Sequence, residues 1–292
     1  MLARDFAILM FVCFVWATNF VATKLALTVL HLPPLFFSSA RFLVVFLFAL
    51  PWLLPWPRPR LRIVMVGLCM GAGGFGLVSI GLMSATPASA AVVTQLGVPI
   101  TALLSVFMLG ERIGWRRGVG IALAFLGAVT VMYDPRGFTL SFGLIFVLAS
   151  AMTSALGMVL MKKMENVQPM QFQAWVGLSS SVPLAFGSLV LETGQVEAAM
   201  AGGWLFVGAL AYVALAVSLL GHSLFYTLVR KYEANLISTL TLMCPLMAIG
   251  LGLGVAVTGD RFDLRMILGT AVVLTGVALI LLAPRKPAAR PR

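Results

Sequence analysis

One short stretch places groups that can bind a small molecule inside an apolar segment. WATNFVATKLAL, residues 16–27, interrupts an otherwise apolar run from 6 to 30. On a helix at about 100° per residue, one face carries Trp16, Asn19, Phe20, Thr23 and Leu27. This face combines aromatic area with amide and hydroxyl groups, which suits a cavity for a neutral amino acid. The alternative is helix packing, because Asn and Thr also form hydrogen bonds between transmembrane helices.

Two cations lie inside apolar segments near that face. Lys24 is about 80° from Trp16 around the helix, and Arg41 lies in the next apolar segment. Inserting a basic residue at the centre of a span costs about 2.5–3.5 kcal/mol. Lys24 and Arg41 each lie roughly 12 Å from the turn at 32–34, so extending the side chain toward the membrane surface relieves part of this cost. None of the nine Asp and Glu residues falls inside an apolar span. Two cations without an acid suit a substrate with a carboxylate or phosphate, and they disfavour a pump for cationic drugs.

Further polar and flexible side chains lie in other apolar segments. The candidates for lining the same cavity are Ser79, Met83, Thr94, Gln95, Ser154, Met158, Trp175, His222, Tyr226 and Met243. A methionine in a span is more often a core residue than a binding residue. Histidine is the one side-chain type in these spans that ordinarily titrates near neutral pH. The alternative for His222 is a packed or hydrogen-bonded histidine. Pro99 and Pro245 each remove a helical hydrogen bond, so they are predicted to bend their helices beside the pathway.

The composition indicates where these residues lie. The chain has 292 residues, of which 61% are hydrophobic and 10% are charged, whereas soluble domains carry about 25% charged residues. This is the composition of an integral membrane protein. The net charge of +11 does not indicate nucleic-acid binding, because the basic residues sit singly between apolar runs. Cys13, Cys69 and Cys244 lie within apolar runs, so we expect neither a disulfide nor thiolate chemistry.

Ten apolar runs are each long enough to form a helix that crosses about 30 Å of hydrocarbon. The predicted spans are 6–30, 35–56, 63–83, 88–108, 114–132, 141–161, 170–191, 204–228, 234–257 and 264–283. The first run is longer than the h-region of a signal peptide, about 7–15 residues, so we expect it to remain as a helix. Both termini are predicted to be cytoplasmic, because fifteen Lys and Arg residues then fall in inner segments and only Arg136, Arg261 and Arg265 in outer loops.

The two halves of the chain repeat one pattern. Gly110, Arg112, Gly120 and Gly127 recur 149 positions later as Gly259, Arg261, Gly269 and Gly276, and Ala88 and Pro99 recur 146 positions later as Ala234 and Pro245. Each copy holds five predicted helices, and an odd number inverts the second copy, as in many secondary transporters. We therefore expect repeats at 1–135 and 136–284 and a basic cytoplasmic tail at 285–292; chance similarity between apolar helices is the alternative. The glycines seven apart predict bare helix faces for close packing.

These residues carry a resemblance to a known family. FVWATNFVATKLAL, PPLFFSSARF and ASAAVVTQLGVPITALLSVFMLGERIGWRRGVGIALAFLGAVTVMY, with a weaker second copy of the last, resemble the drug/metabolite transporter superfamily, EamA type. The resemblance covers nearly the whole chain and implies ten helices in two inverted repeats, with export or exchange of small metabolites. Within the family, the chain is similar to YddG-type exporters of aromatic and neutral amino acids. The second copy departs from the pattern, because GDRFDLRMILG lacks the basic pair that follows GER.

We therefore predict an all-α integral membrane protein that exports small metabolites, chiefly aromatic or neutral amino acids, across the bacterial inner membrane by alternating access. The alternative is an exchanger of sugar phosphates or nucleotide sugars. An intramembrane enzyme is disfavoured, because GLSSS at 177–181 is not a serine elbow and two histidines with three scattered cysteines do not form a metal site. We expect the lipid bilayer and a small-molecule substrate as partners, and no cofactor, metal or nucleic acid. The sequence does not determine the oligomeric state.

Overall fold

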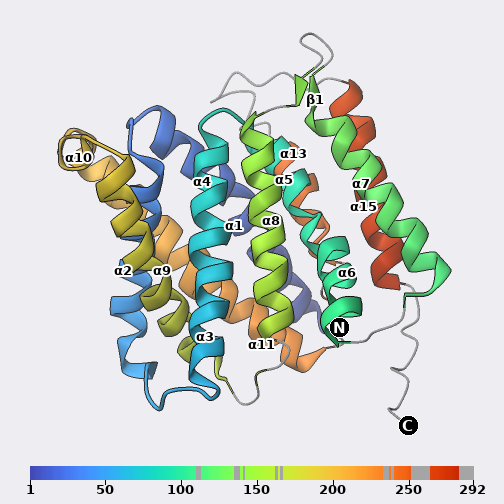
Figure 1. Cartoon of the computed structure of the whole chain (residues 1–292), viewed down its shortest axis with the longest axis horizontal. Helices are drawn as coiled ribbons and strands as arrows, with labels where there is room; N and C mark the ends of the chain where they lie inside the picture. The colour runs from blue at the N-terminus through green and yellow to red at the C-terminus, as the bar shows by residue number, and fades with distance from the viewer. Residues whose placement is uncertain are drawn as a thin grey trace.

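Apolar runs in a bilayer must satisfy their own backbone hydrogen bonds, which a helix does within one segment. The computed structural model describes residues 1–109, 113–134, 139–140, 142–161, 164, 167–232, 237, 240–250 and 264–282. These residues form helices packed side by side, with the first two helices beside elements from the second half of the chain (Figure 1). The all-α fold class predicted from the sequence is confirmed.

The first half of the described chain is helical from Ala3 to Met132 apart from short connections. Its elements are α1 (Ala3–Thr28), α2 (Pro34–Ala49), the 3-10 turn η1 (Leu50–Trp52), α3 (Arg60–Gly67), η2 (Leu68–Gly76), α4 (Leu77–Leu82), α5 (Pro87–Thr94), α6 (Gly97–Leu109) and α7 (Trp115–Met132). Two antiparallel strands of two residues each, β1 (Tyr133–Asp134) and β2 (Thr139–Leu140), follow α7 and pair Tyr133 with Leu140.

The second half is built in the same way. Its elements are α8 (Phe142–Met161), α9 (Pro169–Leu191), α10 (Gln195–Ala211), η3 (Tyr212–Gly221), α11 (His222–Lys231), α13 (Met243–Gly250) and α15 (Leu264–Leu282). In the described part of the chain, nine helices or unbroken helical runs are long and apolar enough to cross a membrane. Each overlaps one of nine predicted spans. The predicted span 234–257 is described only at 237 and 240–250, so the number ten stays a prediction.

The eighth predicted span differs from the structure at its start. We expected it to begin at residue 204, whereas the helical run already begins at Gln195 and continues to Lys231. A kink at Gly203, with φ 49° and ψ −130°, separates the additional turns from the rest. Only glycine adopts such a positive φ without strain. The hydropathy pattern stopped at this kink and missed the helix before it.

Two membrane-spanning runs contain π-helical segments that the sequence did not predict. The first is η2, which lies between α3 and α4 in the third span, and the second is η3, which lies between α10 and α11 in the eighth span. Helices of this wider form are rare and are frequent at functional sites. The third and eighth spans hold corresponding places in the two predicted repeats.

The fourth and ninth spans are interrupted one turn before a proline. Helix α5 ends at Thr94 and α6 begins at Gly97, so the break includes Gln95, which precedes Pro99 by four residues. Thr241 and Leu242 form a turn before α13, and Thr241 precedes Pro245 by four residues. A proline ring collides with the carbonyl four residues earlier and cannot donate to it. This explains why both helices break at equivalent places.

Helices α7 and α15 pack through the repeated glycines. A Cβ on Gly120 would lie 2.6 Å from the Gly276 oxygen, and one on Gly127 would lie 2.7 Å from the Gly269 oxygen. As the residue number rises on α7 it falls on α15, so the two helices are antiparallel. The predicted close packing through these four glycines is confirmed.

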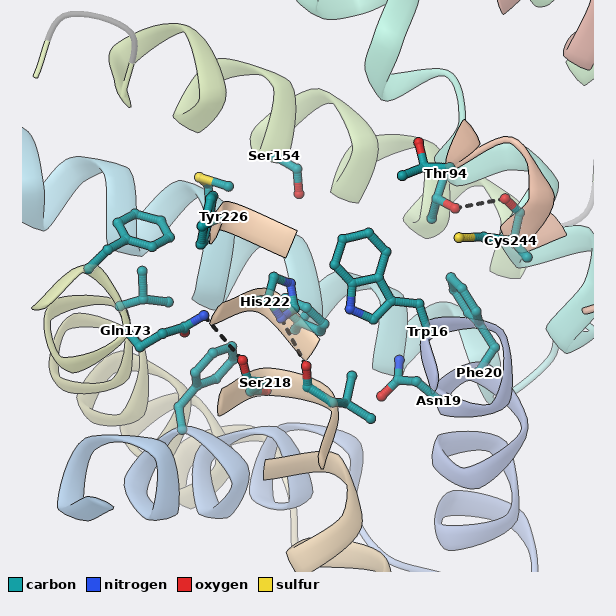
Figure 2. Close-up of a pocket in the computed structure, with 18 of the residues that line it drawn as sticks. Trp16, Asn19, Phe20, Thr94, Ser154, Gln173, Ser218, His222, Tyr226 and Cys244 are labelled. Atoms are coloured by element: carbon teal, nitrogen blue, oxygen red, sulfur yellow. Dashed lines mark hydrogen bonds between the residues drawn. The ribbon is translucent and has the colours of Figure 1, made fainter. Parts of the chain in front are cut away.

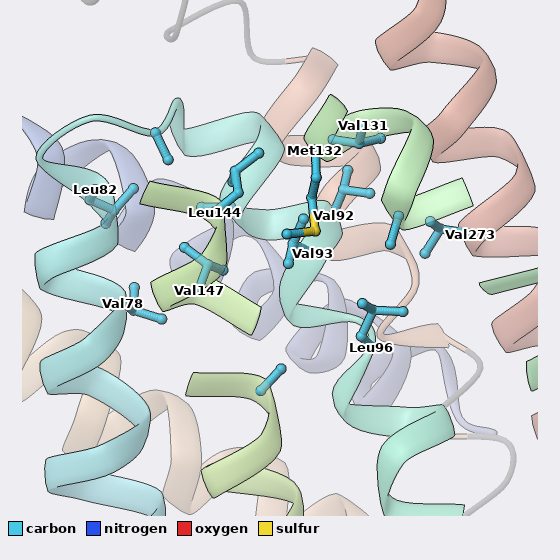
Figure 3. Close-up of a cluster of buried hydrophobic side chains, with 14 of the residues drawn as sticks. Val78, Leu82, Val92, Val93, Leu96, Val131, Met132, Leu144, Val147 and Val273 are labelled. Carbon is cyan, nitrogen blue, oxygen red and sulfur yellow. The ribbon is translucent and has the colours of Figure 1, made fainter. Parts of the chain in front are cut away.

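The largest apolar cluster lies between the helices at one end of the bundle. Figure 3 shows side chains from α4, α5, α7, α8 and α15, and from the break between α5 and α6, converging there, namely Val78, Leu82, Val92, Val93, Leu96, Val131, Met132, Leu144, Val147 and Val273. Outward-facing positions are also apolar, and Phe107, Leu189 and Trp204 are almost fully exposed. Such a surface is stable against lipid tails, which agrees with a multi-pass membrane protein.

Candidate functional site

A cavity of about 330 Å³ lies between helices of the two halves of the chain (Figure 2). It is lined by Trp16, Asn19, Phe20, Phe42, Met70, Phe75, Ala91, Thr94, Gln95, Ser154, Phe172, Gln173, Val176, Val217, Ser218, His222, Tyr226, Thr241 and Cys244. Some of these residues belong to the π-helical segments η2 and η3, and Gln95 and Thr241 lie at the two helix breaks. The volume is at the lower end of the range of about 300–1,000 Å³ typical of small-molecule sites.

Aromatic rings form most of the apolar wall. The Trp16 ring lies 5.0 Å from the His222 ring and 5.0 Å from the Phe225 ring, measured between centroids. Tyr226 packs edge-on against Phe172 with centroids 5.4 Å apart. Rings in mutual contact of this kind form a stiff surface on which an apolar or aromatic side chain can pack.

Polar groups of the wall have fixed hydrogen-bonding directions. His222 Nδ1 lies 3.0 Å from the Val217 carbonyl oxygen and must carry the proton, because a carbonyl only accepts; in a neutral ring, Nε2 is then an acceptor. The Gln173 amide nitrogen donates to the Ser218 carbonyl oxygen at 3.2 Å, so its oxygen remains an acceptor. Figure 2 shows these two side chains on neighbouring parts of the wall.

Arg41 lies directly behind the wall. Its side chain is 3% exposed, its Nε donates to Ser218 Oγ at 2.9 Å, and its Nη1 donates to Asn19 Oδ1 at 3.1 Å. The guanidinium carbon lies 4.2 Å from the centroid of the Phe75 ring, a cation–π contact. Nη2 is buried without a hydrogen-bond partner in the described structure. The cation is therefore solvated only in part.

Half of the side chains proposed from the sequence line this cavity. They are Trp16, Asn19, Phe20, Thr94, Gln95, Ser154, His222 and Tyr226. Arg41 is one layer behind them. Lys24 lies elsewhere: its ammonium donates to the carbonyl oxygen of Leu82, the last residue of α4, at 2.7 Å and to that of Ala85, in the turn before α5, at 3.1 Å. The sequence had led us to expect the two cations in one site, but in the structure they have separate partners.

The remaining sequence candidates lie outside the lining. Thr23 is buried in α1. Ser79 accepts a hydrogen bond from Ser38 at 2.8 Å, and Trp175 donates to the Leu53 carbonyl and stacks on Trp56. The other three are exposed and do not belong to the cavity lining, namely Met83, Met158 and Met243.

Sequence reasoning missed several residues of the wall. Gln173 and Ser218 are polar residues inside predicted spans, so their type was a usable signal. Phe42, Phe75 and Phe172 look like any lipid-facing aromatic residue in the sequence. Met70 and Phe75 reach the cavity from η2, whose π-helical form changes which residues share a face.

The lining is uncharged. It contains no Lys, Arg, Asp or Glu among the described residues, and no group of three or more potential metal ligands occurs in the part of the chain searched. The chemistry that the wall offers is therefore packing and hydrogen bonding of a bound molecule.

A polar cluster lies at the end of α1 where the chain begins. Lys231 and Tyr232 both donate to Asp5 Oδ2, and the Tyr232 hydroxyl accepts from the Leu2 backbone nitrogen at 3.1 Å. The hydrogen bond to Asp5 raises the pKa of the exposed Lys231. Between this cluster and the cavity, Leu9, Leu228 and Ile237 form a buried apolar group. These contacts hold α1 against the end of α11.

Comparison with known proteins identifies a family and several relatives that this chain resembles. The sequence model of the EamA-like transporter family matches residues 6–133 and 141–282. A "Probable amino-acid metabolite efflux pump" of Salmonella typhimurium is 26% identical over 287 residues, which are 94% of this chain and 93% of the relative. A protein of the same name from Escherichia coli K12 is also 26% identical, over 286 residues, with the same coverage of both chains.

Two further matches are a relative found by sequence and a solved structure. An "Uncharacterized inner membrane transporter YedA" of Escherichia coli K12 is 25% identical, over 95% of this chain and 92% of the relative. A solved crystal structure superposes with a TM-score of 0.63 over 97% of this chain and 99% of the other, at 19% identity. At that identity the structural match supports the fold alone.

Proposed function

The chain belongs to the EamA-like transporter family, and on that premise we propose that it is a secondary carrier that exports aromatic or neutral amino acids, or similar metabolites, across the bacterial inner membrane. The role is transport and not catalysis. In this proposal the cavity binds the substrate and opens in turn to each side of the membrane.

The observation that carries the proposal is the composition of the cavity wall. Aromatic rings supply apolar contact for a side chain, while Asn19, Gln173 and His222 supply neutral donors and acceptors. A zwitterion has no net charge, so a neutral polar wall suits it better than a wall rich in one kind of charge. The efflux-pump names of the two relatives point to the same class of cargo.

An exchanger of sugar phosphates is the competing proposal, and Arg41 is the feature in its favour. Phosphate sites normally use several Lys or Arg side chains in direct contact. Here Arg41 is covered by Asn19 and Ser218, and Lys24 faces backbone carbonyls. This distribution favours a substrate with at most one anionic group.

Transport by purified protein in liposomes tests the choice. We expect saturable flux of labelled phenylalanine that excess unlabelled neutral amino acid competes away. A labelled sugar phosphate should not be transported above the level of empty liposomes. Flux of the phosphate without flux of phenylalanine would overturn the amino-acid proposal in favour of the exchanger.

A further inference from the structure

On the basis of the function proposed above, we infer that the Asn19 amide N–H binds the carboxylate of the substrate, and that Arg41 is the positioning residue that turns this N–H toward the cavity. Arginine has donors and no acceptor, so the amide atom facing Arg41 Nη1 at 3.1 Å must be the oxygen. The amide nitrogen then points the other way. Figure 2 shows it turned toward Trp16, while the oxygen points away from that ring.

The nitrogen of Asn19 has no hydrogen-bond acceptor within the described structure, although the residue is only 6% exposed. Asn19 lines the cavity, and its nitrogen is not among the fully enclosed unsatisfied atoms, so it keeps contact with the cavity space. A donor held in this way is ready to bind an acceptor on the bound molecule. Because the described residues supply none, the acceptor in this proposal is a molecule bound in the cavity.

The charge behind Asn19 selects an anionic acceptor over a neutral one. The Arg41 guanidinium is hydrogen-bonded to the neutral groups of Asn19 and Ser218, and its Nη2 is buried without a partner among the described residues. Its positive charge polarises the Asn19 amide, because hydrogen bonds in a chain reinforce one another in surroundings of low dielectric constant. A carboxylate at Asn19 also gains from the charge itself, because the groups hydrogen-bonded to Arg41 in the described part of the chain, Asn19 and Ser218, are neutral.

Acceptors on another part of the wall complete the recognition of a zwitterion. The Gln173 oxygen and His222 Nε2 have no protein donor in the part of the chain that the structure describes. An α-ammonium group donates three hydrogen bonds and accepts none. An amino acid with its carboxylate at Asn19 therefore places its ammonium group toward Gln173 and His222, and its side chain against the rings.

Calorimetric titration of the detergent-purified full chain tests this assignment with three ligands that differ in one group. Phenylalanine has both charged groups, phenylalaninamide lacks the carboxylate, and 3-phenylpropionate lacks the ammonium group. We expect the wild type to bind phenylalanine at least about tenfold more tightly than its amide, which is the size of one hydrogen bond to a charged group. If the wild type binds phenylalanine and phenylalaninamide with equal affinity, the inference is overturned before any variant is made. The proposed function would remain intact.

Asn19→Asp is the sharpest variant, since it keeps the shape, pairs with Arg41 and replaces the donor by an anion. We expect phenylalanine and 3-phenylpropionate to lose about tenfold or more in affinity while phenylalaninamide binds within about threefold of the wild type. Arg41→Gln should reduce the same preference for acid over amide, and Arg41→Lys should restore part of it. A purely structural role for Arg41 would lower stability without changing this ratio. Ser38→Ala, which removes a buried hydrogen bond outside the cavity, is the matched control.

The outcomes separate this inference from the proposed function. If Asn19→Asp keeps the wild-type preference for phenylalanine, Asn19 does not bind the carboxylate and the inference is wrong. If 3-phenylpropionate binds in an Asn19-dependent way and phenylalanine does not bind, the inference stands and the amino-acid proposal fails. If none of the carboxylates binds to the wild type, the cavity is not a carboxylate site and the inference is overturned as well.

Discussion

Trp16 lies near the middle of α1, and its ring lines the cavity and contacts the rings of His222 and Phe225. Replacing Trp16 by alanine removes this wall and leaves space that the neighbouring rings cannot fill. We expect phenylalanine transport at low substrate concentration to fall about tenfold or more, the equivalent of roughly 1.4 kcal/mol of binding. Trp204→Ala is the control, because Trp204 is 88% exposed on α10. Equal flux for Trp16→Ala and the wild type, at equal expression, would contradict the position of the site.

Lys24 gives a prediction of a different kind. Its ammonium donates to the carbonyl oxygen of Leu82, which is at the end of α4 where helical donors are lacking, and to that of Ala85 in the turn that follows. Lys24→Met should lower the free energy of unfolding by about 1–3 kcal/mol and lower the melting temperature measured in detergent. Substrate affinity of the folded variant should not change, and Lys24→Arg should recover most of the stability. A loss of affinity without a loss of stability would return Lys24 to the binding site.

The contrast between Lys24 and Arg41 shows where sequence reasoning stops at this scale. Both were identified as cations inside apolar segments, at similar depth and without an acid in the membrane. Their different roles depend on partners far away in the chain: the carbonyls at 82–85 for Lys24, and Ser218 for Arg41. No local pattern encodes these contacts. Trp16, Asn19 and Phe20 were easier to predict, because one helix face held them together.

At the scale of elements, the spans were predictable because hydropathy is local, whereas their irregularities were only partly so. Pro99 and Pro245 indicated the two helix breaks, since the effect of a proline ring on the preceding turn is local. The π-helical segments η2 and η3 carried no such signal. In η3 the Ser218 hydroxyl donates to the Val213 carbonyl, five residues earlier, while accepting from Arg41. A hydrogen bond from another helix therefore takes part in the irregular geometry.

The contact between α7 and α15 gives an element-scale prediction. A Cβ on Gly276 would lie 2.5 Å from the Ala124 nitrogen and 2.6 Å from the Gly120 oxygen, and backbone atoms cannot rotate away. Gly276→Ala must push the helices apart, with an expected loss of about 1–3 kcal/mol of stability. Gly118→Ala on α7 is the matched control, because a Cβ there would have no heavy atom within 4 Å. Thermal unfolding in detergent compares the two; equal melting temperatures would contradict the packing.

For the whole molecule, several features occur in pairs at corresponding places of the two predicted repeats. The third and eighth spans contain the π-helical segments, the fourth and ninth are broken before a proline, and the fifth and last helices face each other through glycines. The GER and GDR segments, which suggested the repeat, lie outside the described residues. An inverted repeat remains our proposal for this arrangement, and the antiparallel contact of α7 with α15 is its main support.

That contact makes a definite prediction about the membrane. Because α7 and α15 are antiparallel, their first turns, near Arg116 and Leu264, lie at opposite ends of the helix pair. The excess of basic residues in the segments assigned to the inside places Arg116 in the cytoplasm and Leu264 outside it. After the three native cysteines are replaced by serine, a thiol reagent that cannot cross membranes should label Leu264→Cys in intact cells. It should label Arg116→Cys only after the membrane is opened. Labelling of both from the same side would contradict the inverted repeat, and the cavity would lose its place between two oppositely inserted halves.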